Sequence, residues 1–180
     1  PRSGRSLGPA DYDRLPGEHE NFLGAKNGTA SVVMLHDLLR AAPAIRQFYT
    51  ELGYPQGCQV GEPGYLMSLT TMNMSLAVPF FEAGVRRDWA TLFGMQAEAL
   101  DILEWLVGGT GAEIGTGAFP GSKPHMDGAY EKLLAKVHDP RFPLRLLPPY
   151  QSTTDEGCAA FVATVRERLP HWLPSTAGPG

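Results

Sequence analysis

The stretch RRDWATLFGMQAEALDILEWLV, residues Arg86–Val107, is the clearest structural signal in the sequence. Its large apolar side chains recur every three to four residues, and this spacing predicts a helix of about six turns. Acidic side chains lie toward the other side. The apolar face consists of Trp89, Leu92, Phe93, Gln96, Leu100, Leu103 and Val107. We expect this helix to be the core of the fold, with Trp89, Phe93, Leu100 and Leu103 buried.

Two further helices are expected after this one. A glycine-rich loop from Gly108 to Gly121 ends the long helix. A second helix is expected over Ser122–Val137, with the serine as its N-cap. The segment Thr153–Glu156 matches a capping box and predicts a third helix, which Pro170 closes.

Helical spacing also predicts, before the long helix, either one helix kinked at Pro43 or two short helices. The first covers Ser31–Arg40, and either Thr29 or Ser31 is suited to cap it. The second covers Ala44–Leu52, and Gly53 is expected to stop it in a left-handed conformation.

Residues 63–81 carry no charged side chain and fit three structures. Strict alternation over residues 71–78 favours a half-buried strand. The spacing of Leu66, Leu69, Asn73 and Leu76 fits a buried helix that ends near Pro79. The uncharged run also reaches the lower length limit of a membrane span, although five polar residues and Pro79 interrupt it.

These elements predict a mainly α fold. We expect four to five helices, a long extended N-terminal arm, and one short strand or hairpin near residues 65–78. The expected organisation is an extended arm over residues 1–26, a single helical domain over residues 27–173, and a tail over residues 174–180.

Composition narrows the classes of function. The chain has 180 residues, with 15 Lys and Arg against 19 Asp and Glu, and therefore a net charge of −4. A pI near 5.7 argues against binding nucleic acid by phosphate neutralisation. The two cysteines, Cys58 and Cys158, are too few for a structural zinc site, and we expect both to be unpaired thiols.

No motif for a known reaction is complete. The glycine-rich loop lacks the Lys and Ser/Thr of a phosphate-binding loop. The pair His125 and Asp127 has the spacing of a metal-binding His-x-Asp motif, and His36 lies on an apolar helical stripe from which it could bind a metal or haem. A small soluble enzyme or ligand-binding domain with a metal or cofactor site at His36, His125 and Asp127 is therefore one hypothesis.

One short stretch is similar to a known family. Phe48–Tyr54, followed by Tyr65–Met67, resembles the helix-then-strand passage of glyoxalase-type metal enzymes over about 25 residues of the chain. The segment before Phe48 is predicted as helix where that family has a strand, and no metal-ligand Glu is identifiable later. No residue role is transferred.

The leading hypothesis is a non-catalytic helical subunit of a larger protein assembly, such as an organellar respiratory or photosynthetic complex. It rests on the incomplete motifs and on a start at Pro1, which fits a chain whose targeting peptide has been removed. The partners would be other protein subunits, with no nucleic acid, and a membrane only indirectly through the assembly. The arm and tail would dock on these subunits, and the expected anchors in the arm are Tyr12, Leu15, Phe22 and Leu23.

Overall fold

The computed structural model describes residues 7–29, 31–41, 43–108 and 128–174. The chain divides into two compact units. The first unit consists of residues 1–68 and 80–96, and the second of residues 69–79 and 97–180. The predicted glycine-rich loop, the Ser122 cap and residues 175–180 of the predicted tail lie outside the described residues.

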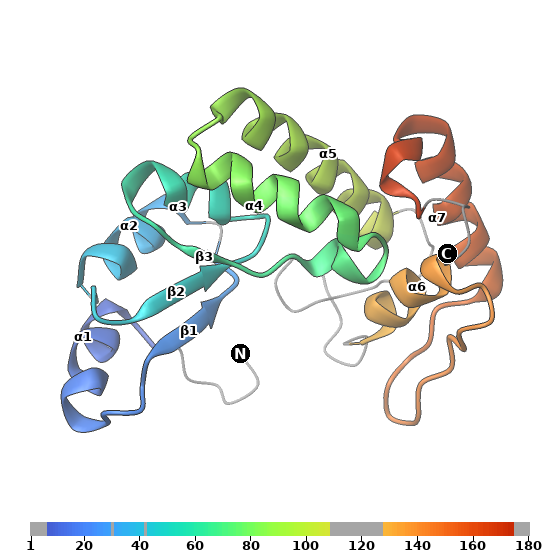
Figure 1. Cartoon of the computed structure of the whole chain (residues 1–180). Helices are drawn as coiled ribbons and strands as arrows, with labels where there is room; N and C mark the ends of the chain where they lie inside the picture. Colours follow the sequence, from blue (N-terminus) through green and yellow to red (C-terminus); the bar gives the residue numbers. More distant parts are fainter. Residues whose placement is uncertain (1–6, 30, 42, 109–127, 175–180) are drawn as a thin grey trace. The chain divides into compact units, whose positions relative to one another are not determined.

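The first unit is built on a three-stranded parallel sheet. Strands β1 (Gly24–Asn27), β2 (Arg46–Tyr49) and β3 (Gly64–Tyr65) lie in that order across the sheet. Helix α2 (Val32–Ala41) connects the first two strands, and helix α3 (Tyr54–Val60) connects the last two (Figure 1). Parallel strands need such crossover helices, because a tight turn cannot return the chain in the same direction.

The helices of the first unit enclose an aromatic core. Tyr49 on β2 is fully buried and belongs to one apolar cluster with Leu35 of α2 and Tyr54 of α3. Phe80 and Leu92 complete this cluster from later in the chain. The Tyr49 side chain therefore points to the helix-covered face of the sheet.

The predicted extended arm is wrong. Residues Pro9–Glu18 form helix α1, which contacts α2, and residues Gly24–Asn27 form β1. Tyr12 is buried in a cluster with Leu38 and Ile45. The arm thus carries two regular elements and supplies part of the core of its own unit.

The helix predicted over Ala44–Leu52 is a strand instead. Its apolar residues fit helical spacing, but β2 occupies Arg46–Tyr49 and pairs with a strand on each side. Gly53 does not end a helix: it is the N-cap of α3, and Pro55 lies in the first turn of that helix. A fixed φ near −65° and a missing N–H suit proline to that position.

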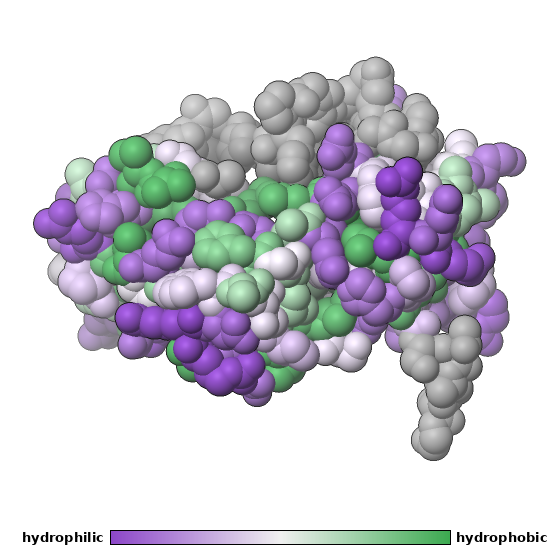
Figure 2. Space-filling view, turned by 90° about the horizontal axis from the view of Figure 1, so that it is seen from above, coloured by the Kyte–Doolittle hydropathy of each residue, from purple (hydrophilic) through white to green (hydrophobic). Residues whose placement is uncertain are grey.

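The uncharged segment forms no strand over residues 71–78. It contains β3 (Gly64–Tyr65), the 3-10 helices η1 (Ser68–Thr71) and η2 (Met74–Leu76), and the start of helix α4 (Ala77–Val85). In the described part of the chain, no helix has the length and apolar character that a membrane span requires. On the face in Figure 2, apolar residues form separate patches rather than a continuous band.

The long helix is confirmed as α5 (Trp89–Gly108), but its buried face differs from the predicted one. Leu103 is buried, whereas Trp89 and Leu100 are 38% and 40% exposed. Phe93 is half-buried. The residues on the buried face are Leu92, Gln96, Ala99, Ile102, Leu103 and Leu106.

The second unit contains helices α6 (Ala129–His138) and α7 (Asp155–Arg168) and the 3-10 helix η4 (Pro170–Trp172). The predicted start of α7 is confirmed, because the Thr154 side chain accepts a hydrogen bond from the Gly157 N–H at 3.0 Å. This contact satisfies one of the backbone donors that a helix leaves unpaired at its N-terminus.

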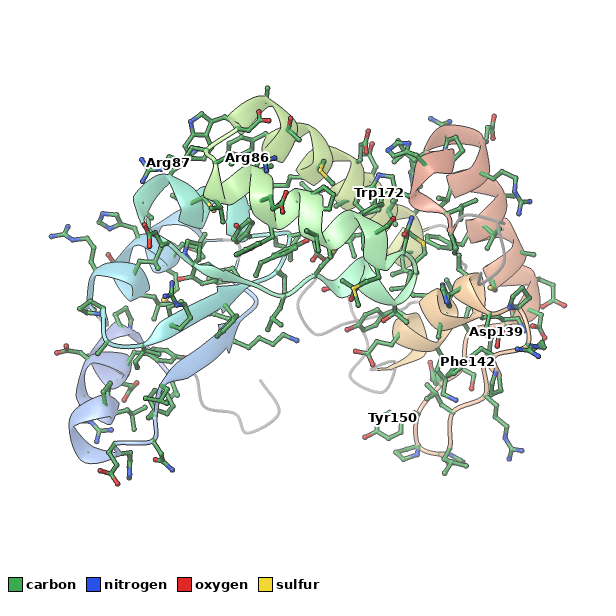
Figure 3. All side chains as sticks on the ribbon, in the orientation of Figure 1. Arg86, Arg87, Asp139, Phe142, Tyr150 and Trp172 are labelled. Carbon is green, nitrogen blue, oxygen red and sulfur yellow. The ribbon has the colours of Figure 1, made fainter. Side chains whose placement is uncertain are left out.

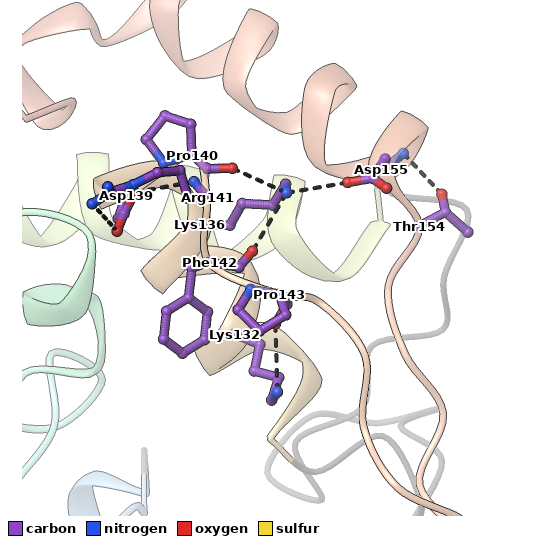
Figure 4. A network of polar contacts seen from close by, with 10 residues as sticks. Lys132, Lys136, Asp139, Pro140, Arg141, Phe142, Pro143, Thr154 and Asp155 are labelled. Carbon is purple, nitrogen blue, oxygen red and sulfur yellow. Dashed lines mark hydrogen bonds and ion pairs between the residues drawn. The ribbon is translucent and has the colours of Figure 1, made fainter.

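Lysine side chains of α6 bind the irregular segment that follows it (Figure 4). Lys136 Nζ lies 3.2 Å from the Pro140 carbonyl oxygen and 3.3 Å from a carboxylate oxygen of Asp155 at the start of α7. Lys132 Nζ donates to the Arg145 carbonyl oxygen at 2.7 Å. These contacts hold the connection between α6 and α7 against α6.

Across the described residues, the structure has seven α-helices and a parallel sheet. The alternation of strand and helix in the first unit defines an α/β arrangement. The expectation of a mainly helical fold of four to five helices is therefore wrong.

Candidate active site

Lys26 lies near the C-terminal edge of the parallel sheet. Lys26 is the third residue of β1, and the register pairs it with Phe48 of β2, which is paired with Gly64 of β3. Residues paired in this way point to the same face of a sheet. Since Tyr49 points to the helix-covered face, Lys26 and Phe48 point to the opposite face, and Lys26 is exposed there.

Gly64 shapes this face of the sheet. A Cβ atom at this position would lie 2.4 Å from Cδ1 of Phe48, so any larger residue would push the aromatic ring away. Glycine in a strand often marks such a close approach. The ring of Phe48 therefore lies over the β3 backbone, beside the strand that carries Lys26.

A buried carboxylate links the segments that follow β2 and β3. Glu51 is 1% exposed, and its Oε2 accepts a hydrogen bond from the Ser68 N–H at 3.0 Å. The Glu51 backbone oxygen accepts a second hydrogen bond, from Nε2 of Gln96 on α5, at 2.8 Å. The first contact holds the turn after β2 next to the segment after β3, and the second holds the same turn against α5.

The surroundings of Glu51 shift the pKa of its carboxyl group in opposite directions. Burial raises the pKa of the Glu51 carboxyl, because a carboxylate is poorly solvated in the interior. The Ser68 N–H and the positive charge of Lys26 act in the opposite direction, and burial is the largest of these effects. Lys26 is therefore within electrostatic reach of Glu51. Burial also raises the pKa of Tyr65, the last residue of β3.

Glu51→Gln is expected to make the protein more stable than the wild type at neutral pH. The unfolded chain releases the Glu51 proton at its ordinary pKa, whereas the folded protein releases it only at a higher pH. Stability therefore falls as the pH rises through this interval. Glutamine keeps an oxygen that can accept from Ser68 but has no proton to lose in this range. Urea denaturation from acidic to neutral pH measures the effect.

The exposed Glu104 supplies a matched control for this measurement. Glu104→Gln makes the same exchange at the surface, where substitutions usually change stability by less than about 0.5 kcal/mol. A Glu51→Gln variant less stable than the wild type at neutral pH would mean that contacts of the carboxylate outweigh its burial.

The structure describes one of the three residues of the predicted metal site. His36 lies on α2 with its side chain 43% exposed, and its Nδ1 is 3.4 Å from Oδ1 of Asp37. His125 and Asp127 lie outside the described residues. Within the ranges that the structure does describe, no three His, Cys, Asp or Glu side chains are grouped as metal ligands would be. The metal site stays a prediction.

The predicted partner anchors differ in exposure. Tyr12 is buried, Phe22 is half-buried against the same cluster, and Leu15 is half-buried. Leu23 is 70% exposed, at the residue before β1. Two of the four side chains thus pack within the first unit, while docking on other subunits stays untested.

Lys26 and Glu51 were both missed by sequence reasoning. Lys26 follows the short apolar run Phe22–Ala25 and precedes a glycine turn and a helix. This order is typical of a strand–helix unit, which was the available signal. Glu51 follows Phe48 and Tyr49 directly, and recognising those residues as a strand would have placed it at a strand end.

Similar proteins were found by structure but not by sequence. No family model matches the chain, and no curated protein matches it. Among solved structures, the chain is similar to YagE, a prophage protein from E. coli K12 that belongs to the dihydrodipicolinic acid synthase family and was solved in complex with pyruvate. The TM-score is 0.71 at 16% sequence identity, over 91% of this chain and 52% of that chain. The chain therefore spans about half the length of YagE.

The class of fold follows from this match. The chain has the TIM-barrel-like fold of the dihydrodipicolinate synthase family, with seven described helices and a small parallel sheet. In TIM-barrel enzymes, the active site lies at the C-terminal ends of the strands. Lys26 and Glu51 lie at that end of the sheet.

The match corrects the leading functional hypothesis. It contradicts the prediction of a non-catalytic helical subunit of a membrane-associated complex. YagE belongs to an enzyme family, and its fold differs from the mainly helical one that was predicted. The alternative of a small enzyme fits this finding better. The stretch Phe48–Tyr54, which resembles glyoxalase-type enzymes, is not a helix here: it covers the end of β2, the turn after it and the first residue of α3.

Proposed function

We propose that this protein is an enzyme that binds a small 2-oxo acid such as pyruvate and forms a Schiff base with it through Lys26. The main support is the position of Lys26, exposed near the C-terminal end of a parallel strand in a fold similar to that of a pyruvate complex. Lysine amines form Schiff bases with carbonyl substrates in many enzymes.

The step takes up one proton from solvent. After losing its own proton, the Lys26 amine attacks the ketone carbon of the oxo acid. The carbonyl oxygen then leaves as water with one amine hydrogen and the proton from solvent, and a protonated C=N bond, the iminium, forms. The resulting iminium withdraws electrons from the neighbouring carbon and lowers the barrier to making or breaking a bond there. The negative substrate carboxylate is attracted by the positive charge on the iminium nitrogen.

Residues around Lys26 support such a site. Glu51 supplies a carboxylate within electrostatic reach of the lysine, and its hydrogen bond from Ser68 holds it in place. Phe48 supplies an aromatic surface on the same face of the sheet. The site combines an amine, a fixed carboxyl group and an apolar neighbour, which suits a small molecule with both polar and apolar ends.

Borohydride reduction in the presence of pyruvate is expected to attach the protein covalently to one pyruvate unit. The reducing agent adds hydride to the C=N bond and turns a reversible imine into a stable secondary amine. Intact mass spectrometry detects the added mass, and peptide mapping assigns it to one lysine. We expect the modified residue to be Lys26.

Two variants make this assignment specific. Lys26→Arg keeps the positive charge but removes the nucleophilic amine, and it should lose the adduct. Lys132→Arg is the control, because Lys132 Nζ is held by backbone carbonyl oxygens of another segment, and it should react like the wild type. An adduct that persists in Lys26→Arg, or none in the wild type, would refute the proposed function.

A further inference from the structure

A cavity lies at the opposite, N-terminal edge of the same sheet. Its volume is about 260 Å³, and it lies where β2 begins, at Arg46, and just before β3, at Pro63. Tyr54 and Phe81 supply aromatic walls, while Arg46 and Arg87 bring guanidinium groups. All these residues belong to the first unit, and the proposed Schiff-base site does not use them.

Arg46 is held at the rim of this cavity. Its guanidinium donates a hydrogen bond to the Glu62 carbonyl oxygen at 2.7 Å. This contact uses one of the five N–H groups of an arginine, and the planar group keeps others for a ligand. Glu62 also lines the cavity and is the acidic residue on its rim, against two arginines.

Arg87 reaches the cavity through an unusual backbone conformation. Its φ is 56°, in the left-handed region that residues with a side chain rarely adopt. The turn is fixed by backbone hydrogen bonds, from Arg87 N to Gly84 O at 3.1 Å and from Asp88 N to Ala83 O at 2.9 Å. Such outliers cluster at ligand sites, where the surrounding structure maintains them.

The charged residues on either side of Arg87 make other contacts. Arg86 pairs with Glu82 of the same helix at 3.0 Å, and Asp88 accepts a hydrogen bond from the Thr91 N–H at 3.2 Å. Figure 3 shows Arg86 and Arg87 close together at the end of α4. The two adjacent arginines thus have different surroundings, and it is Arg87 that lines the cavity.

The interior of the cavity is apolar with one thiol. Cys58 is 6% exposed, and burial raises the pKa of its thiol, while the positive charge of Arg87 opposes this effect. The Tyr54 hydroxyl donates to the Phe81 backbone carbonyl oxygen at 2.8 Å, which fixes the Tyr54 ring beside the cavity, and the Phe81 ring stacks on it with the centroids 5.9 Å apart. The cavity is therefore positive at its rim and apolar within.

We propose that this cavity binds a small organic anion, with its carboxylate or phosphate on Arg46 and Arg87 and its apolar part against Tyr54 and Phe81. Guanidinium groups bind both kinds of anion through paired hydrogen bonds. The volume suits a ligand of a few carbon atoms rather than a nucleotide. The site is separate from Lys26. A result that refutes anion binding here therefore leaves the Schiff-base proposal standing, and the reverse also holds.

Calorimetric titration of the full chain with butyrate and with inorganic phosphate tests this proposal. Butyrate should bind, because it offers both a carboxylate and an apolar chain. Arg87→Gly should weaken binding about tenfold or more, the cost of losing a hydrogen bond to a charged group. Glycine accepts a positive φ, so this variant keeps the turn. Arg86→Ala should bind like the wild type.

Alkylation of Cys58 supplies a second measurement in the same samples. Butyrate should slow the reaction of Cys58 with iodoacetamide and leave that of Cys158 unchanged, because Cys158 lies in the other unit. Binding of butyrate, alone or together with phosphate, with loss in Arg87→Gly supports the proposal. Binding of phosphate alone, equal binding by Arg87→Gly, or no binding by the wild type overturns it.

Discussion

Phe80→Ala is expected to lower the free energy of unfolding by about 3–5 kcal/mol. The Phe80 side chain is fully buried, and its ring centroid lies 4.9 Å from that of Tyr65 and 5.9 Å from that of Tyr54. Alanine would lose the burial of a whole ring and leave a cavity that rigid aromatic neighbours cannot fill. Urea denaturation followed by circular dichroism measures the change.

The next residue supplies the control for this prediction. Phe81 is 39% exposed, and its contact with the Tyr54 hydroxyl runs through its backbone oxygen, which any substitution retains. Phe81→Ala should therefore cost clearly less than Phe80→Ala. Equal effects of the two substitutions would mean that the aromatic core of the first unit is not packed as described.

Removing the Phe80 ring should also affect the candidate active site, because this ring packs against Tyr65 at the end of β3. Tyr65 ends β3, and Ser68, three residues later, donates to Glu51. A cavity beside Tyr65 would loosen the strand end that holds this carboxyl group. We expect the pyruvate adduct of Phe80→Ala to form more slowly even where the variant remains folded.

Local signals in the sequence were sufficient to predict several of the helices. Ser31 accepts a hydrogen bond from the Met34 N–H at 3.4 Å, and Thr154 caps α7, as their side chains predicted. These contacts join residues three apart in the chain, so a short stretch of sequence contains both partners. The long run of apolar residues in α5 is local in the same sense.

The strands could not be predicted in this way, because their partners are distant in the sequence. Strand β2 is four residues long and pairs with segments about 20 residues before and after it. Ile45, Phe48, Tyr49 and Leu52 happen to fit helical spacing as well. Adjacent apolar residues such as Phe48 and Tyr49 are typical of parallel strands, which show no clean alternation.

The candidate active site depends on those strands, and so it was missed with them. A lone lysine such as Lys26 has no local feature that distinguishes it from a solvated surface residue. It becomes notable only when the register places it beside Phe48 and when Glu51 is found buried nearby. The predicted histidines, by contrast, were chosen by spacing along the chain, which does not report distance in the fold.

Trp172→Ala is expected to destabilise the second unit by about 3–5 kcal/mol. Trp172 is 1% exposed and ends η4, which contacts α7 (Figure 3). Its indole Nε1 donates to Oε2 of Glu98 at 2.6 Å, and His171 Nε2 lies 2.8 Å from the same oxygen. Alanine removes the largest buried side chain of the unit and one donor to this carboxylate. Urea denaturation followed by circular dichroism measures the loss.

Two further substitutions separate packing from hydrogen bonding at Trp172. Trp172→Phe keeps an aromatic ring but loses the N–H group, and it should cost about 1–3 kcal/mol, the penalty for a donor lost from a partly buried carboxylate. His171→Ala should cost less than either, because the His171 side chain is 55% exposed and its ion pair with Glu98 is solvated. If His171→Ala were as damaging as Trp172→Ala, the carboxylate contact rather than indole burial would hold η4 in place.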